Sequence, residues 1–140
     1  MIASMYAAVK SRLESHTLLS SRVSPSARLD SAGALVRSNY VIVYPTAPVV
    51  LDDDRFAKPQ AVDSDATFLV DVKVVAVDAL GCALLTDAVL TQMVGHQLVI
   101  SGRVCTPAKL DSTSIVRPDN SVSPPLFYTD LSFEIISRRT

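Results

Sequence analysis

The sequence is poor in the residues and patterns that most catalytic, metal and membrane sites require. Its 140 residues include two histidines and two cysteines, and the formal net charge is −1. Proteins that bind nucleic acid through its phosphates usually carry a basic excess, so this charge balance argues against that class. The apolar runs are far shorter than the roughly 20 residues of a membrane helix. No basic region followed by an apolar block opens the chain, so we expect no secretion signal.

Neither histidine belongs to a recognisable catalytic motif. His16 ends the apolar stripe of a predicted first helix, and His96 follows a predicted turn at Gly95. A Ser–His–Asp site needs a base that a third group holds against the nucleophile, and the sequence has no Gly-x-Ser-x-Gly elbow. We therefore expect a protein that is not an enzyme and that has no catalytic residues, cofactor or metal ion. A small enzyme with an unrecognised site is the alternative.

The chain has the length and composition of one folded domain. Hydrophobic residues make up 49% of the sequence, which argues against a disordered chain. We expect a single domain over residues 1–140, because this length suffices for one core and is too short for two. Cys82 and Cys105 fall in a predicted helix and a predicted strand without a close-spaced motif. We expect two buried free thiols there, with a disulfide as the alternative.

The clearest structural pattern is a strand, a capped helix and a second strand. Residues 67–77 alternate between apolar and other side chains, which predicts a strand with one buried face. Asp78 is placed as the N-cap, and Gly95 as the left-handed C-terminal residue, of a helix over 79–94. Residues 97–104 are predicted to form one further strand. The buried face of the first strand should carry Phe68, Val70, Val72, Val74 and Ala76.

The rest of the chain supplies a second helix and two more strands. Residues 1–16 are predicted to be an amphipathic helix that docks on the sheet, and strands are expected at 38–44 and 126–137. The segments 45–66 and 107–125 are expected to be long loops. The order favours an α+β fold: a mainly antiparallel four-stranded sheet with both helices packed on one face. Core residues of the last strand should be Phe127, Leu131, Phe133 and Ile135.

The apolar residues of helix 79–94 point to two nearly opposite sides. A helix that is apolar all round is buried on more than one side. Either the first helix covers the second side or a neighbouring subunit does, and periodicity cannot separate these alternatives. We take Leu84 and Met93 as candidate interaction residues. One side carries Leu80, Leu84 and Val94, and the other carries Leu85, Val89 and Met93.

A cluster of acidic residues occupies the first predicted loop. Asp52, Asp53 and Asp54 are followed by Arg55, and Lys58 neutralises them further. The spacing and the glycine of an EF-hand loop are missing, which argues against a metal site. A solvated loop tip is the simplest interpretation, and an electrostatic docking surface is the alternative. The three aspartates and Arg55 are therefore candidate interaction residues.

The order of these segments resembles one known family. The features that carry the likeness are the docking N-terminal helix, the strand and proline Tyr40–Pro45, the charged loop, the strand Thr67–Val77 with its following helix, and the last strand Phe127–Arg139. Together they resemble the tail terminator (tail completion) proteins of long-tailed bacteriophages and related minor tail proteins. The likeness covers most of the chain and lies in size, element order and strand texture, since the family has no short signature motif.

The resemblance implies a structural protein of the virion tail or neck, assembled in the host cytoplasm. Tail terminators form rings, commonly hexamers, that cap the tail tube, stop its growth and present the surface for head joining. The implied partners are further copies of the chain, the tail tube protein and a head-completion or connector protein, with DNA passing through the channel unbound. A near-neutral chain suits this passage, because a strongly basic lumen would hold DNA. The resemblance does not extend in detail to the two long loops, and the long, proline-rich segment 107–125 does not align with the family. This departure keeps a head-closure or head–tail adaptor protein as the alternative.

Overall fold

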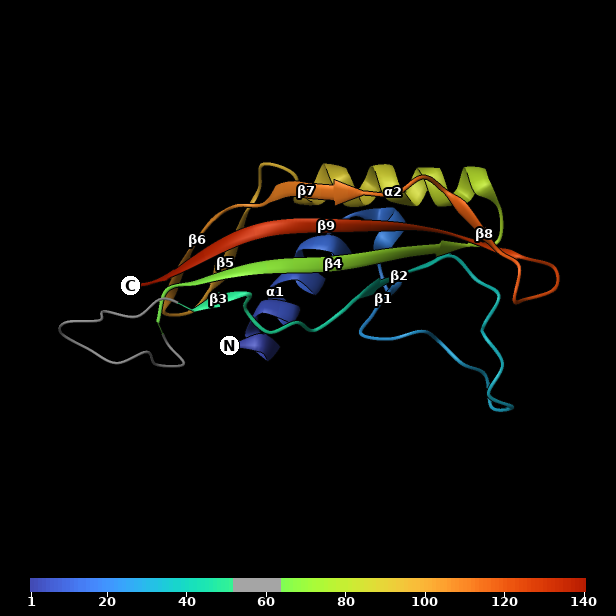
Figure 1. Cartoon of the computed structure of the whole chain (residues 1–140), viewed down its shortest axis with the longest axis horizontal. Coiled ribbons are helices and arrows are strands. Elements are labelled where there is room, and N and C mark those ends of the chain that lie inside the picture. The colour runs from blue at the N-terminus through green and yellow to red at the C-terminus, as the bar shows by residue number, and fades with distance from the viewer. Residues whose placement is uncertain (52–63) are drawn as a thin grey trace.

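The computed structural model describes residues 1–51 and 64–140, which form one sheet with helices packed on it (Figure 1). The described elements are, in chain order, α1 (Ile2–Glu14), the 3-10 helix η1 (Thr17–Leu19), β1 (Val23–Ser24), β2 (Tyr40–Val43), β3 (Val50–Leu51), β4 (Ala66–Ala76), α2 (Ala79–Met93), β5 (Gln97–Ile100), β6 (Arg103–Pro107), β7 (Lys109–Thr113), β8 (Arg117–Asp119) and β9 (Leu126–Arg139).

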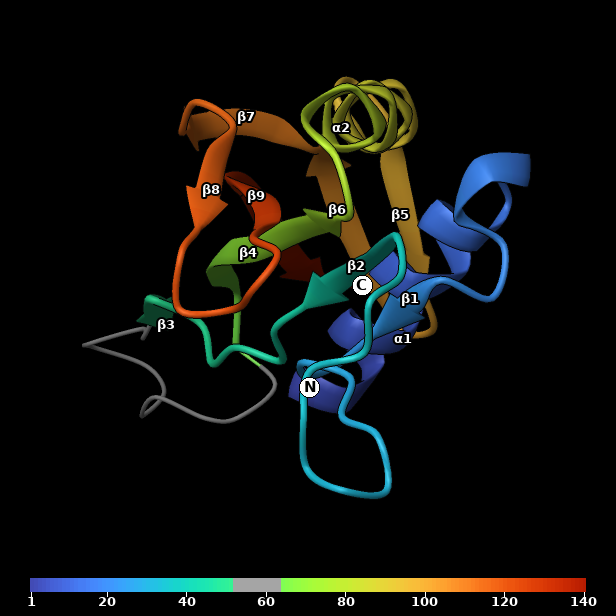
Figure 2. The ribbon, with the colours of Figure 1, turned by 90° about the vertical axis from the view of Figure 1, so that its right-hand side faces the viewer.

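Two long antiparallel strands, β4 and β9, form the centre of the sheet. Their register runs without a break from Ala66 opposite Ser137 to Ala76 opposite Phe127. β2 and β3 pair with the other edge of β4, while β6, β7 and β8 follow one another along the other edge of β9. The main path is β1-β2-β4-β9-β6-β5, in which β1 and β2 are parallel. The end view in Figure 2 shows that this mixed sheet is curled rather than flat.

The predicted mainly antiparallel four-stranded sheet is wrong. Within the described residues the sheet has nine strands and includes a parallel pair. The segment 107–125, predicted to be a loop, contains β7 and β8, and the predicted single strand 97–104 is a hairpin of β5 and β6. Most side chains of β7 and β8 are exposed, so these strands lack the apolar alternation that marks a half-buried strand. They are strands because their backbones pair with β9.

The helix α2 begins and ends for the reasons that its sequence indicates. The Asp78 carboxylate accepts a hydrogen bond from the Gly81 backbone N–H, as an N-cap should. Just beyond the helix, Gly95 adopts φ +75°, a conformation that is costly for other residues. α1 buries Met5, Val9 and Leu13 of its predicted stripe. Both predicted helices are therefore confirmed, with ends that differ by one or two residues.

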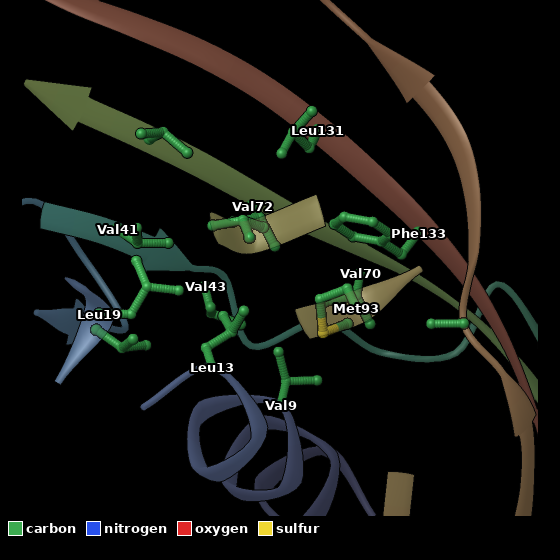
Figure 3. Packing of buried hydrophobic residues seen from close by; sticks show 14 of the residues in the cluster. Val9, Leu13, Leu19, Val41, Val43, Val70, Val72, Met93, Leu131 and Phe133 are labelled. Carbon is green, nitrogen blue, oxygen red and sulfur yellow. The ribbon is translucent and has the colours of Figure 1, made fainter. Parts of the chain in front are cut away.

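One core joins the helices to the concave face of the sheet. The alternating residues of β4 from Ala66 to Ala76 are buried, as are Leu131, Phe133 and Ile135 of β9. The close-up in Figure 3 shows side chains of α1, of α2 and of the sheet pointing into this core. Val72 and Phe133 are 1% and 0% exposed and lie in the same cluster, so the predicted phase of both strands is confirmed. Phe127 is partly buried at its edge.

Candidate functional site: two exposed apolar faces

The histidines and acids of the described residues do not gather around a reactive group. His16 Nδ1 accepts a hydrogen bond from the Leu18 backbone N–H at 3.1 Å and so caps η1, while His96 is exposed. Across residues 1–51 and 64–140, no three His, Cys, Asp or Glu side chains lie close enough to hold a metal ion. Neither α1 nor α2, in the described part of the chain, has the length and hydropathy that crossing a bilayer requires.

Both cysteines are free and buried, as the sequence predicts. The Cys82 Sγ lies 3.3 Å from the Thr129 Oγ1 and 3.9 Å from the Val74 carbonyl oxygen. Burial raises the pKa of the Cys82 thiol, and the hydrogen bond with Thr129 opposes this in part. A neutral, enclosed thiol is a poor nucleophile. We therefore assign Cys82 to the core between α2, β4 and β9.

The two apolar sides of α2 have different surroundings. Leu85, Val89 and Met93 are 3%, 0% and 0% exposed, whereas Leu80 and Leu84 are 72% and 54% exposed. α1 contacts α2, β5, β1 and β2, yet the second side of α2 stays open to solvent. Of the two alternatives that the sequence left open, cover by the first helix is excluded, and cover by a neighbouring subunit stays a prediction. We name the exposed stripe of Leu80, Leu84, Asp87 and Thr91 the helix face.

The two candidate interaction residues on α2 lie on opposite sides of it. Met93 is fully buried and points into the core (Figure 3), so its contacts are with this chain itself. Leu84 belongs to the helix face and is available for contact with another molecule. The four candidates Asp52, Asp53, Asp54 and Arg55 lie outside the described residues. Close to that segment, the Asp65 Oδ1 accepts a hydrogen bond from the Arg139 backbone N–H at 2.9 Å.

A second exposed apolar surface lies on the β5–β6 hairpin. Val99 and Val104 are direct cross-strand partners and are 91% and 51% exposed. Arg138 of β9 pairs with Val104 and is also exposed, so it continues the same row across three strands. We name Val99, Val104 and Arg138 the hairpin face. It points away from the core, because the neighbours of the two valines in sequence, Leu98 and Cys105, are buried in the core cluster.

The hairpin face does not follow from the predicted single strand over residues 97–104, because that prediction places no turn in this segment. The signal was present in Ser101-Gly102, a two-residue turn of the kind that joins hairpin strands. Gly102 adopts φ +76° there, and the register places Ile100 opposite Arg103. With the turn recognised, Val99 and Val104 fall opposite each other on one face of the hairpin.

A small pocket lies on the convex face of the sheet. It is lined by residues that include Tyr40, Ile42, Val75 and Leu126, which form a second apolar cluster. The Lys73 Nζ at its rim lies 4.4 Å from the ring centroid of Tyr128. The pocket volume of about 100 Å³ is well below the roughly 300 Å³ at which typical small-molecule sites begin.

Comparison with known proteins gives a likeness of fold. No protein-family model matches the sequence, and no curated protein matches it. A chain of the solved structure "Virion of native gene transfer agent (GTA) particle" has a similar fold, with a TM-score of 0.69 and 17% sequence identity. The likeness covers 94% of this chain and 92% of that chain. It therefore extends over nearly the whole of both chains, and what it shows is the fold.

Proposed function

We propose that this protein is a structural component of a phage-type virion and acts as a tail terminator. In this role, copies of the chain assemble in the host cytoplasm into a ring, with six subunits as the expected number. The ring caps the tail tube, stops its polymerisation and offers a surface for joining to the head. Its partners are the tail tube protein and a head-completion or connector protein, and DNA passes through the channel without specific binding.

The observation that carries this proposal is the fold match with a virion chain over nearly the full length of both proteins. A match confined to one motif would fit many functions, whereas here the likeness extends over 94% of this chain and 92% of a chain from a virion. The sequence resemblance to tail terminators, which rests on size, segment order and strand texture, points to the same class of particle.

The exposed apolar residues of the molecule support a function in assembly. Leu80, Leu84, Val99 and Val104 all expose at least half of their side-chain surface. Grouped exposed apolar residues usually mark protein–protein contacts in soluble proteins. A protein whose function is to contact copies of itself and other virion proteins accounts for this exposure.

Deletion of the gene from the particle-producing strain tests the proposal directly. Loss of a tail terminator should give tails of uncontrolled length, which electron microscopy measures as a broad distribution with a long tail. Complementation by the wild-type gene is the control and should restore a narrow distribution. Free tails of normal length beside filled heads would contradict a terminator and favour a head-closure or adaptor protein. Intact particles of normal yield would contradict every structural role in the particle.

A further inference from the structure

We propose that the helix face of one copy packs against the hairpin face of the next copy, so that subunits associate head to tail. This inference rests on the proposed ring function and names the two surfaces that form the ring. It assigns a role to exposed apolar residues that the fold itself does not use. The occupant of each face is therefore a second copy of this chain.

The helix face begins at the end of the molecule opposite to the hairpin face, and this placement suits a head-to-tail contact. α2 starts where β4 ends, near Ala76 opposite Phe127, so Leu80 lies at that end of the β4–β9 ladder. The hairpin face lies at the other end, where Val104 pairs with Arg138 close to the C-terminus. Figure 1 shows these two ends on opposite sides of the molecule. A contact between two different surfaces is the geometry that builds rings, whereas a self-complementary contact builds dimers.

The charges on the two faces are complementary. Within α2, all of whose residues are described, Asp87 is the one charged side chain, and it lies in the stripe with Leu80 and Leu84. Arg138 is the charged member of the hairpin face and adjoins Val104. Docking leucines on valines in a head-to-tail contact can bring the carboxylate toward the guanidinium. Such pairs mainly set partner choice and association rate.

The same charges disfavour pairing of like faces. Two helix faces brought together around Leu84 would place one Asp87 near the other, and two hairpin faces would do the same with Arg138. Like charges in an interface destabilise the wrong pairing. The helix face is thus better suited to the hairpin face of another copy than to the helix face of another copy, and the same holds for the hairpin face. This asymmetry is the reason that we infer a head-to-tail contact rather than a symmetric dimer.

Two single variants and their mixture test the inference with purified protein. Leu84→Asp removes the helix face and leaves the hairpin face, while Val99→Asp does the reverse. Size-exclusion chromatography with light scattering should show an oligomer for the wild type and a monomer for each variant. The 1:1 mixture should give a heterodimer that grows no further, because it contains one intact pair of faces. Ile115→Asp, at a residue that is 73% exposed elsewhere, is the matched control and should assemble like the wild type.

A charge exchange provides a second test in which the apolar residues are unchanged. Asp87→Arg and Arg138→Asp should each weaken assembly on the order of 2- to 10-fold, as expected for a partly exposed ion pair. The variant that carries both changes should recover assembly. Circular dichroism spectra should be the same for all surface variants, and their melting temperatures should agree when measured below the concentration at which the wild type assembles. Met93→Asp, on the buried side of α2, should instead lose folding and assembly together.

Several outcomes would overturn the inference. The first is a wild type that stays monomeric at high concentration, and the second is a surface variant that assembles like the wild type. The third is a 1:1 mixture of the two variants without heterodimers. The fourth is a Val99→Asp protein that forms dimers by itself. Unfolding of Leu84→Asp or Val99→Asp would also overturn it, since both side chains would then belong to the core. Tail-length control is measured separately. Normal tail-length control by the Leu84→Asp and Val99→Asp variants in complementation would reject these faces while the proposed function stands.

Discussion

Truncation of Phe133 to alanine should remove a large share of the stability of this protein. Phe133 lies near the middle of β9, is 0% exposed, and has Val70 of β4 and Leu110 of β7 as its cross-strand partners. Its ring points into the core that both helices share (Figure 3). Phe133→Ala therefore leaves a cavity where the sheet meets α1 and α2. Such a truncation costs about 3–5 kcal/mol, because lost burial and the cavity add together.

This cost is large compared with the total stability of a typical domain, which is about 5–15 kcal/mol. For a domain of this length we expect about 3–4 °C of melting temperature per kcal/mol, which gives a decrease of about 10–20 °C. Urea unfolding followed by circular dichroism measures the free-energy difference at 25 °C. The comparison requires a similar dependence on urea for both proteins, because a changed slope would indicate a changed denatured state.

Ile115→Ala is the control for this prediction, since Ile115 is 73% exposed between β7 and β8. Its truncation should change the free energy of unfolding by at most about 0.5 kcal/mol. Two results would refute the reasoning. One is a loss below about 1 kcal/mol for Phe133→Ala, and the other is an equal loss for the two variants. Either would mean that β9 presents its other face to the core.

Three further predictions follow from caps, turns and burial. Asp78→Ala should lower the free energy of unfolding by about 1 kcal/mol in urea titrations, because the N-cap of α2 is lost, and a value near zero would contradict this. Gly95→Ala should cost about 1–2 kcal/mol by the same measurement, since φ is +75° there. The folded-state pKa of Cys82 is raised above its ordinary value of 9.0 by burial, so above pH 9.0 an unfolded chain releases a proton that the folded chain retains. The contribution of the Cys82 thiol to the free energy of unfolding should be complete below pH 9.0 and should decline as the pH rises further. Cys82→Ala should make the free energy of unfolding depend less on pH in this range. Equal pH profiles for the wild type and the variant would contradict this prediction.

The sequence predicts the parts of the fold that are set by local pattern. The alternation of apolar residues identifies β4 and its buried face, and Asp78 and Gly95 mark the ends of α2. These features need few long-range contacts to be recognised, because period, cap and turn are encoded within a few residues. The same holds for the buried face of β9, where Phe133 lies as expected.

The sequence does not predict β7, β8 or the parallel pairing of β1. These strands are short, and their residues have no apolar alternation. They exist because long strands offer unpaired backbone edges that nearby segments can satisfy by hydrogen bonding. Such pairing depends on where distant segments come together. The β5–β6 turn differs, since Ser101-Gly102 is a local signal that periodicity alone did not reveal.

Only part of the candidate site could be predicted from the sequence, because burial also depends on where distant segments come together. Periodicity predicts two apolar sides on α2, and it cannot tell which of Leu84 and Met93 lies in the core. Their separation into surface and core depends on the position of α1, which contacts α2, β5, β1 and β2 and leaves Leu84 exposed. Position in a fold is a tertiary property, so burial by this chain and burial by a partner give the same pattern.

A head-to-tail contact has a consequence that bears on the proposed function. Contacts between two different surfaces form a ring if the rotation between subunits closes, and an open filament if it does not. A protein that ends the growth of a tube has to stop its own assembly as well, so its contact must close. The helix face begins with Leu80 at the end of the β4–β9 ladder that lies opposite to the hairpin face. Closure therefore depends on the angle between these faces. The curl of the sheet fixes that angle, because β5 and β6 carry the hairpin face at one end of the strand path and α2 packs on β4 and β9 at its centre. The curled architecture thus relates directly to whether copies of this chain form a closed ring.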